Sequence, residues 1–257
     1  MNVFPGLPAD RAALGAWIKM PAIESVELMA EAGMDLVVID LEHSSLSIET
    51  ASVLTSVALG RGLVPFVRIP DQSPTWIQRC LDFGARAIVV PHVDSLEQAL
   101  SVRNAAHFEP RGRRGMGPTS RAGAWNLRGP ADYVASAERV KVIVQIESSA
   151  GVAALASMLT RGAVDGVLVG AADLSMSLGL AMDHPEVSAH MLEALDQCLA
   201  HSVPCAIAGS ADGRAAAEFA DRGFSAVIAG NDATMLGAAA RAVVDTAGIS
   251  RDVVGTP

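Results

Sequence analysis

The sequence predicts a single (β/α)8 barrel, a TIM barrel in the α/β class, that extends over residues 1–257 as one domain. Two observations carry this prediction. Short runs rich in β-branched residues alternate with longer amphipathic segments from one end of the chain to the other. The short runs are also almost continuously apolar, which is typical of parallel strands buried on both faces.

Eight runs have this character, and we expect strands at residues 14–19, 35–40, 64–69, 86–91, 141–147, 165–170, 203–208 and 225–230. Amphipathic segments lie between them, and several end in a glycine, which is the usual stop of a helix. A last helix is expected at 232–245. Eight strands joined by helical crossovers match the count for a barrel. The alternative, a doubly wound sheet, would need a GxGxxG loop after an early strand, and none follows there.

The composition narrows the classes of function. Hydrophobic residues make up 51% of the chain and the net charge is −9, which argues against a nucleic-acid partner. No apolar stretch approaches the roughly 20 residues that a membrane helix needs, so no membrane contact is expected. The N-terminus has no secretory pattern, and the three cysteines form no CxxC pair. We therefore expect a cytoplasmic protein.

One long segment, at about 108–130, matches neither a helix nor a strand. Loops of this length in compact domains are usually functional or form contacts between subunits. We expect it to act as a flap over the site or as a subunit contact.

Two carboxylates carry the first prediction of a site. Glu147 and Asp173 follow neighbouring strands at the end of the barrel where catalytic groups gather, about 5 Å apart in the sheet direction. Carboxylates this close repel one another unless a cation lies between them, and oxygen ligands suit Mg²⁺, Mn²⁺ or a related hard ion. An alternative stays open, in which Asp173 caps the following helix and Glu147 pairs with an arginine.

Histidines follow two other strands. His43 is a candidate general base, because an imidazole titrates near neutral pH, and Asp40 is close enough in sequence to orient it. His92 is a second candidate on the same grounds. Either histidine could instead be structural.

Arg68 ends the third strand, inside the ring of the other groups. An arginine in an apolar barrel mouth needs an anionic partner, and a substrate carboxylate or enolate would serve. The alternative is a salt bridge to Glu42 or Glu147.

Several motifs together resemble one family. In order along the chain they are DLVVIDLEHS, PFVRIP, LDFGARAIVVPHV, RRGMGPTSRAG, VIVQIES and VDGVLVGAADLS. They resemble the 4-hydroxy-2-oxoheptanedioate and 2-keto-3-deoxyglucarate aldolases, which are class II pyruvate aldolases related to the citrate lyase β-type barrels. The resemblance extends from about Leu14 to Asp245, and it implies a barrel, a hexamer and a divalent metal.

The resemblance also implies roles for single residues. Glu147 and Asp173 correspond to the metal ligands, His43 to the general base, and Arg68 to the arginine that stabilises the transition state. Asp173 also corresponds to a substrate-binding residue, as does Arg68.

Three further positions have counterparts in the family. Gln145 and Ala172 correspond to substrate-binding residues, and Asp82 to an aspartate that raises the basicity of the histidine. Asp82 belongs to the end of a helix that should face the other end of the barrel, so it reaches His43 only from a neighbouring subunit. The chain also has Ala171 where many relatives have proline, which should loosen that turn slightly.

The expected function is that of an aldehyde-lyase, an enzyme of the EC 4.1.2 type. It would cleave a 4-hydroxy-2-oxo acid reversibly to an aldehyde and pyruvate or hydroxypyruvate, through a metal-stabilised enolate, in sugar-acid or aromatic catabolism. The expected partners are thus a small 2-oxo acid and an aldehyde, and further copies of the chain. Sites made of carboxylates and water accept several ions, so we expect Mg²⁺, Mn²⁺ or Co²⁺, with Zn²⁺ as a further candidate.

Three alternatives stay open. A Schiff-base aldolase needs an activated lysine, and Lys19 ends the first strand at the correct face. A related lyase acting on an acyl-CoA ester or phosphoenolpyruvate could use the arginines at 113, 114 and 121. A non-catalytic binding barrel should lack the groups found at the strand ends.

Overall fold

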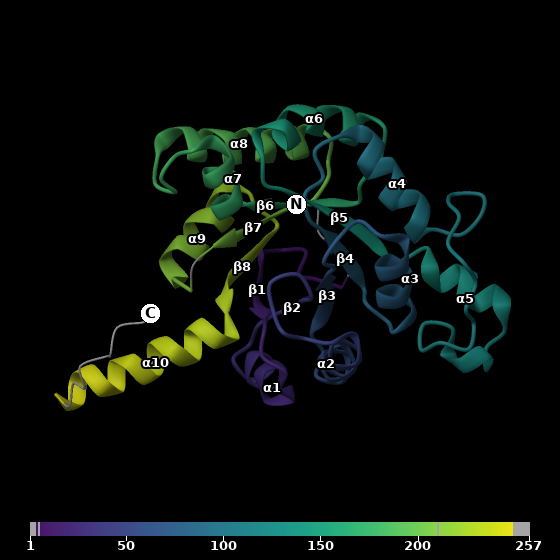
Figure 1. Ribbon diagram of the computed structural model, residues 1–257, viewed down its shortest axis with the longest axis horizontal. Helices are drawn as coiled ribbons and strands as arrows, with labels where there is room; N and C mark the ends of the chain where they lie inside the picture. Colours follow the sequence, from purple (N-terminus) through teal and green to yellow (C-terminus); the bar gives the residue numbers. More distant parts are fainter. Residues whose placement is uncertain (1–3, 5, 210, 249–257) are drawn as a thin grey trace.

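The computed structural model describes residues 4, 6–209 and 211–248, in which eight parallel strands close into a barrel (Figure 1). Each strand pairs with the next in sequence, and β8 pairs with β1. The strands are β1 (Ala13–Ile18), β2 (Leu36–Asp40), β3 (Val64–Arg68), β4 (Ala87–Val90), β5 (Lys141–Ile146), β6 (Gly166–Gly170), β7 (Cys205–Gly209) and β8 (Ala226–Asn231). The predicted (β/α)8 fold is therefore confirmed. Residues 1–3 and 249–257, at the ends of the predicted domain, lie outside the described residues.

Helices follow the strands around the barrel. They are α1 (Ile23–Glu31), α2 (Ile48–Gly60), α3 (Pro74–Asp82), α4 (Leu96–Ala106), α5 (Pro130–Ala137), α6 (Ser149–Thr160), α7 (Ala171–Leu178), α8 (Pro185–Ala200), α9 (Gly213–Arg222) and α10 (Asp232–Ala247). Serine begins four of them: the side chains of Ser47, Ser73, Ser95 and Ser148 accept a backbone N–H of the first turn. Such caps satisfy donors that the helix itself leaves free.

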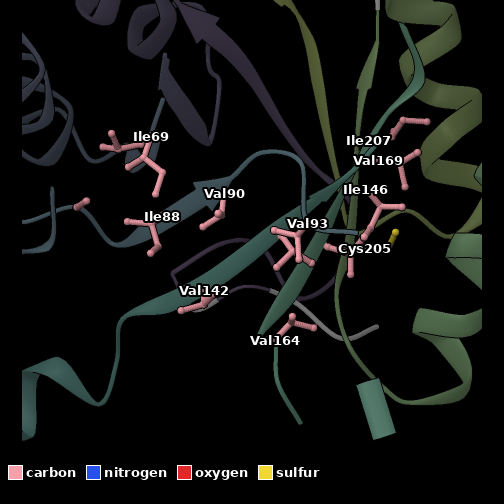
Figure 2. Packing of buried hydrophobic residues seen from close by; sticks show 14 of the residues in the cluster. Ile69, Ile88, Val90, Val93, Val142, Ile146, Val164, Val169, Cys205 and Ile207 are labelled. Carbon is pink, nitrogen blue, oxygen red and sulfur yellow. The ribbon is translucent and has the colours of Figure 1, made fainter. Parts of the chain in front are cut away.

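Alternation along each strand divides the apolar residues into two layers. Leu36 and Val38 of β2 belong to the core inside the barrel, whereas Val37 and Ile39 belong to the core between the barrel and the helices. Figure 2 shows part of that outer layer, around β4 to β7. Since successive side chains of a strand point to opposite faces, every second residue of a strand contributes to the barrel interior.

Phe4 fills the N-terminal end of the barrel interior. Its side chain is 1% exposed, and its ring lies 5.4 Å from the ring of Phe66 in an edge-to-face arrangement. A Cβ at Gly166 would overlap the Phe4 ring, so the first residue of β6 must be glycine for the ring to fit. Phe4 thus closes the N-terminal end of the barrel interior, and the functional groups gather at the opposite, C-terminal end.

Two segments depart from a regular barrel. Helix α10 runs away from the barrel in Figure 1, and Asp232 at its start is the one buried side chain among its residues. The predicted irregular segment at about 108–130 contains a short 3-10 helix, η1 (Ala124–Asn126), whose three residues all have positive φ. Its role as a flap or a subunit contact stays a prediction.

None of the helices in the described residues combines the length and the apolar character that crossing a bilayer requires.

Removing the Phe4 ring should test how much this residue stabilises the barrel. Phe4→Ala leaves a cavity inside the barrel, and we expect it to lower the free energy of unfolding by about 3–5 kcal/mol. Urea titration followed by circular dichroism measures the change. Leu28→Ala is the control, because Leu28 is 64% exposed on α1 and should change stability by about 0.5 kcal/mol or less. Equal effects of the two substitutions would contradict the role assigned to Phe4.

Candidate active site

Polar side chains form the uppermost inward layer of the barrel. Asp40 follows Leu36 and Val38 in the inward set of β2, and Arg68 follows Val64 and Phe66 in that of β3. The same alternation turns Lys19 inward after Trp17, and Gln145 inward after Ile143. The polar groups therefore stand directly on the apolar interior core.

Asp40 and Arg68 form the central ion pair of this layer. They are register partners at the ends of adjacent strands, and Arg68 Nε and Nη2 donate to the two carboxylate oxygens at 2.8 and 2.7 Å. The guanidinium also stacks on Trp17, 4.2 Å from the ring centroid. Burial by itself raises the pKa of Asp40, but the hydrogen bonds and charges of Arg68 and Lys19 outweigh it and lower the pKa to about 2. Asp40 is therefore ionised at neutral pH.

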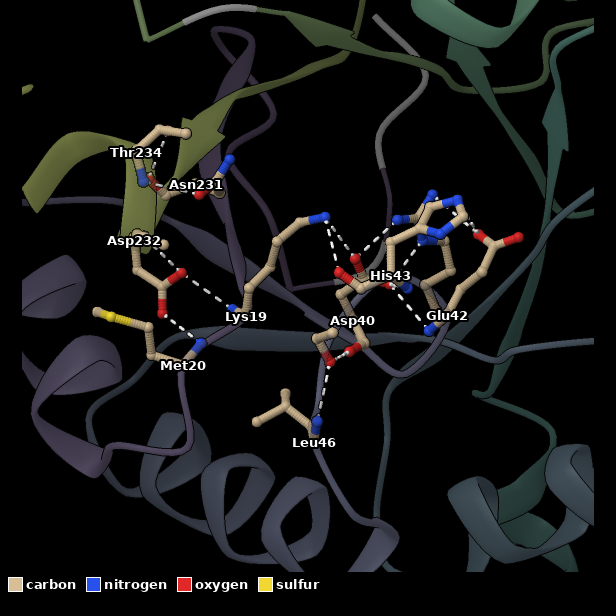
Figure 3. A network of polar contacts seen from close by, with 12 residues as sticks. Lys19, Met20, Asp40, Glu42, His43, Leu46, Asn231, Asp232 and Thr234 are labelled. Atoms are coloured by element: carbon tan, nitrogen blue, oxygen red, sulfur yellow. Dashed lines mark hydrogen bonds and ion pairs between the residues drawn. The ribbon is translucent and has the colours of Figure 1, made fainter. Parts of the chain in front are cut away.

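The turn that carries His43 is built on the same carboxylate (Figure 3). Asp40 Oδ1 accepts the backbone N–H groups of Glu42 and His43 at 3.1 and 3.3 Å. Lys19 Nζ lies 3.0 Å from Asp40 Oδ2 and donates to the carbonyl of His43 at 3.2 Å. The prediction that Asp40 orients His43 therefore has a geometric basis, which runs through the backbone and not the imidazole ring.

The His43 ring projects from this turn into the barrel mouth. Its side chain is 59% exposed, and Nε2 lies 3.8 Å from the Glu42 carboxylate. Glu42 is nearly buried and also lies 3.0 Å from Arg68 Nη1. An exposed imidazole beside a carboxylate can accept a proton from a group in the mouth.

Glu147 is buried on the other side of the mouth. Its Oε1 accepts the backbone N–H of His92 at 2.7 Å and lies 2.8 Å from His92 Nδ1, while Gln145 Nε2 donates to its Oε2. The pKa of Glu147 is raised, first by burial and then by the nearby charges of Asp173 and Glu42, although His92 opposes the shift. Glu147 pairs with His92, so the alternative of an arginine partner is wrong.

His92 bridges two carboxylates. Its Nε2 lies 3.2 Å from Glu42 Oε1, and its backbone has a positive φ of 55°. Positive φ is uncommon for a residue with a side chain, and here it turns both the N–H and the ring toward Glu147. The structure thus gives His92 a bridging position that the sequence did not reveal.

Asp173 lies in the first turn of α7 and lines the same mouth. Gly170, not Asp173, precedes this helix as its N-cap, and no side chain caps it. The alternative of Asp173 as a helix cap is therefore wrong. A Cβ at Gly170 would lie 3.2 Å from Glu147 Cβ and 3.1 Å from Gln145 Nε2, so the absence of a side chain there leaves the space in which these groups meet.

The mouth opens into a cavity of about 620 Å³. Four predicted site residues line it beside His43 and Lys19, namely Arg68, Gln145, Ala172 and Asp173. The cavity continues between α8 and α9, where apolar side chains such as Met191 and Phe219 form its walls. Its size suits a small ligand with a few polar anchors.

Asp82 lies elsewhere. At the end of α3, its Oδ1 accepts hydrogen bonds from Arg114 Nη2 at 2.6 Å and from the Tyr133 hydroxyl at 3.0 Å. It lines a separate cavity with Arg79 and Arg121, not the one that contains His43. Within one chain the structure therefore does not bring Asp82 to the other predicted site residues.

Four carboxylates meet at the mouth, those of Asp40, Glu42, Glu147 and Asp173. In the described part of the chain, no group of three or more His, Cys, Asp and Glu side chains is arranged to hold an ion. Asp173 lines the cavity and Glu147 is buried beside Gly170 in its wall. This pair could supply oxygen ligands to an ion, and water or substrate would complete such a site.

Besides the bridging position of His92, the sequence did not reveal the partners of Arg68 and Lys19. It assigned Arg68 a partner in the substrate or in Glu42 or Glu147, whereas its closest partner is Asp40. Aligning the ends of the second and third strands would have found this pair. It also treated Lys19 only as a possible nucleophile, whereas the structure shows its ammonium against Asp40.

Comparison with known proteins agrees with this arrangement. Residues 14–239 match the family described as HpcH/HpaI aldolase/citrate lyase. The 4-hydroxy-2-oxo-heptane-1,7-dioate aldolase of Salmonella paratyphi C is 34% identical over 264 residues, covering 97% of this chain and 95% of that protein. The hydroxypyruvate/pyruvate aldolase of Rhizorhabdus wittichii is 33% identical over 240 residues, covering 91% of this chain and 93% of that one.

A solved structure is similar over the same length. A HpcH/HpaI aldolase/citrate lyase family protein from Burkholderia cenocepacia superposes with a TM-score of 0.87 at 28% identity, covering 95% of this chain and 97% of that one. The barrel, the residues at its mouth and these matches along nearly the whole chain lead to one conclusion. The chain belongs to the HpcH/HpaI aldolase/citrate lyase family and is a lyase of the aldolase type.

Proposed function

We propose that this enzyme cleaves a 4-hydroxy-2-oxo acid reversibly to pyruvate or hydroxypyruvate and an aldehyde, with the help of a divalent metal ion. One observation carries the proposal: Arg68, His43 and the carboxylate of Asp173 line a single cavity at the C-terminal mouth of the barrel, with the Glu147 carboxylate buried beside Gly170 in its wall. The names of the aldolases to which the chain is similar support the same reaction class.

Glu147 and Asp173 are the proposed metal ligands. Their oxygens are the donors that Mg²⁺, Mn²⁺ and Co²⁺ accept, with Zn²⁺ as a further candidate. The residues fit the ion: Glu147 is buried near the charges of Asp173 and Glu42, which raises its pKa, and a cation would relieve that repulsion. When bound, such an ion supplies a Lewis acid that polarises the carbonyl of a 2-oxo acid.

Arg68 is the proposed partner of the substrate oxygen. Two of its nitrogens are held by Asp40, and Nη1 is directed toward Glu42 and Gln145, at 3.0 and 3.4 Å from their oxygens. Trp17 fixes the plane of the guanidinium. A cation held this rigidly can stabilise the negative charge that develops on the enolate oxygen as the C3–C4 bond breaks.

His43 is the proposed general base. It would take the proton of the C4 hydroxyl in cleavage and a C3 proton of pyruvate in synthesis. Gln145 and Ala172, which line the cavity, are the proposed contacts of the 2-oxo acid. The small side chain of Ala172 leaves room for the methyl or hydroxymethyl group.

We further propose that the enzyme works as a homo-oligomer, and as a hexamer by its family resemblance. In this arrangement Asp82 of one copy would approach His43 of another, because the two residues line separate cavities within one chain. The exposed face of α10 is available for contacts between copies. The cytoplasm is the proposed location, since Cys80, Cys198 and Cys205 are free thiols.

Chelation should remove activity. We expect the enzyme to lose aldol cleavage in excess EDTA and to recover it with Mg²⁺, Mn²⁺ or Co²⁺. Glu147→Gln or Asp173→Asn should weaken metal binding by about 100-fold or more, because each removes one of two protein ligands. Calorimetric titration of the ion measures the affinity, and Glu218→Gln, a carboxylate on the far wall of the cavity, is the matched control. Full turnover after complete chelation would exclude the metal.

Replacing His43 should abolish proton transfer. We expect His43→Ala to lower kcat by about 10² to 10⁴-fold, the usual contribution of a positioned base. Exchange of the pyruvate methyl protons in D₂O, followed by NMR, should slow by a similar factor, because it reports C3 deprotonation without any aldehyde. His190→Ala, at a half-buried histidine of α8 outside the cavity lining, should leave both rates unchanged. Unaltered exchange in His43→Ala would assign the base elsewhere.

Lys19 distinguishes this mechanism from a Schiff-base aldolase. Its ammonium contacts the Asp40 carboxylate and donates to the His43 carbonyl. To act as a nucleophile, Lys19 would first have to lose its proton and break both contacts. We expect Lys19→Met to raise KM for the 2-oxo acid about tenfold, equivalent to about 1.4 kcal/mol, while cleavage persists. Borohydride should trap no pyruvate adduct on the unaltered enzyme. An adduct on Lys19, with no activity left in Lys19→Met, would support the Schiff base instead.

A further inference from the structure

A second cavity, of about 330 Å³, lies between the N-terminal end of β4 and the irregular segment that precedes β5. Five arginines line it, namely Arg86, Arg114, Arg121, Arg128 and Arg139, and no aspartate or glutamate does. This arginine-lined cavity shares no residue with the cavity at the barrel mouth. Such a concentration of positive charge is unexpected on a chain with a net charge of −9.

Most of these arginines have no acidic partner of their own. Among the described residues, no carboxylate oxygen lies within 4.0 Å of the side-chain nitrogens of Arg86, Arg121, Arg128 or Arg139. Among the described residues, Arg114 is the one arginine of the cavity lining that forms an ion pair, with Asp82. The guanidinium groups around the cavity therefore keep their charge and their hydrogen-bond donors available.

Arg114 forms a fixed wall of the cavity. Its side chain is 1% exposed, and Nη2 is held by Asp82 at 2.6 Å and faces the Tyr133 hydroxyl at 3.3 Å. Its Nε is buried and has no hydrogen-bond partner in the described part of the chain. A buried donor without a partner is costly, so a ligand that accepts from it would be favoured.

The positive charge continues into the neighbouring groove. Arg86 and Arg139 also line a cavity of about 340 Å³ next to Phe4, at the N-terminal end of the barrel, together with Lys141. Arg86 and Lys141 stand at the starts of adjacent strands, where the Lys141 N–H donates to the Arg86 carbonyl at 3.2 Å. The barrel framework therefore fixes the backbone positions from which these cations extend.

We propose that the arginine-lined cavity binds a small phosphate-bearing anion. Guanidinium groups form paired hydrogen bonds with phosphate oxygens, and several unpaired arginines around one cavity call for a ligand with more than one negative charge. The volume suits a small molecule and not a folded partner. The acidic net charge of the chain argues against a nucleic acid.

The ligand has two possible sources that share this chemistry. One is an inorganic or simple organic phosphate. The other is a nucleoside diphosphate, for which the ring of Trp125 offers a stacking surface: it lines the same cavity, is 57% exposed, and lies 5.5 Å from the Arg121 guanidinium. Within one chain the arginine-lined cavity lies outside the mouth, and Arg86 and Arg139, which test it, are not among the residues proposed for the aldol reaction.

Calorimetric titration of the full-length protein with inorganic pyrophosphate, and separately with ADP, tests the proposal. No metal is added, because pyrophosphate chelates divalent ions. We expect saturable binding that Arg86→Gln/Arg139→Gln weakens by at least about tenfold. Arg161→Gln is the matched control, an exposed arginine at the end of α6 that should leave the affinity within about twofold. Circular dichroism confirms that each variant is folded.

The two ligands identify the source. Equal affinities for pyrophosphate and ADP would assign the site to the phosphate groups alone, whereas tighter ADP binding that Trp125→Ala abolishes would assign it to a nucleotide. The proposal is overturned if neither ligand binds, or if Arg86→Gln/Arg139→Gln binds as well as the unaltered protein. It is also overturned if light scattering shows that the double variant has lost subunits, since the arginines would then serve an interface between copies.

Discussion

The mouth of this barrel depends on one buried carboxylate, that of Asp40. It is fully buried, yet two cations hold it in its charged form: Arg68 through two hydrogen bonds and Lys19 through its ammonium. The same group accepts the backbone N–H groups of the turn that carries His43. A single buried charge thereby orients both the arginine and the turn that carries the histidine, and removing it would leave Nε and Nη2 of the buried Arg68 without their acceptor.

The opposite side of the mouth depends on an absent side chain. Gly170 allows Glu147 and Gln145 to approach the start of α7, and a methyl group there would contact both. His92, with its positive φ, meets Glu147 with both its backbone N–H and its ring. Because Glu147 is thus fixed from several directions, an ion bound there would find one of its ligands already in place.

The two ends of the barrel have opposite electrostatic character. The four carboxylates of Asp40, Glu42, Glu147 and Asp173 surround the cations of Lys19 and Arg68 at the C-terminal mouth. Arginines, most of them without an acidic partner among the described residues, gather beside the N-terminal ends of β4 and β5. The first arrangement favours a metal ion together with an anionic substrate, and the second favours an anion alone. The apolar interior between them, closed by Phe4, keeps the two charged regions apart.

The sequence by itself determined the barrel and most of the mouth. The eight apolar runs predicted the strands, because a strand buried on both faces has no polar pattern to obscure it. Position at a strand end was enough to select His43, Arg68, Glu147 and Asp173 as candidates, since parallel strands deliver their C-terminal residues to one place. Gln145 was selected only by the family resemblance.

Only the tertiary structure decided how those groups are paired. Asp40 pairs with Arg68 because of the register between β2 and β3, and His92 pairs with Glu147 because of the positive φ of its backbone. Neither the register nor this backbone angle can be read from composition or periodicity. The separation of Asp82 from His43, and the gathering of Arg86, Arg121 and Arg139 around one cavity, likewise follow from folding. Local pattern fixes which face of a strand a side chain takes, whereas contacts between residues far apart in the chain depend on how the strands and loops are placed in space.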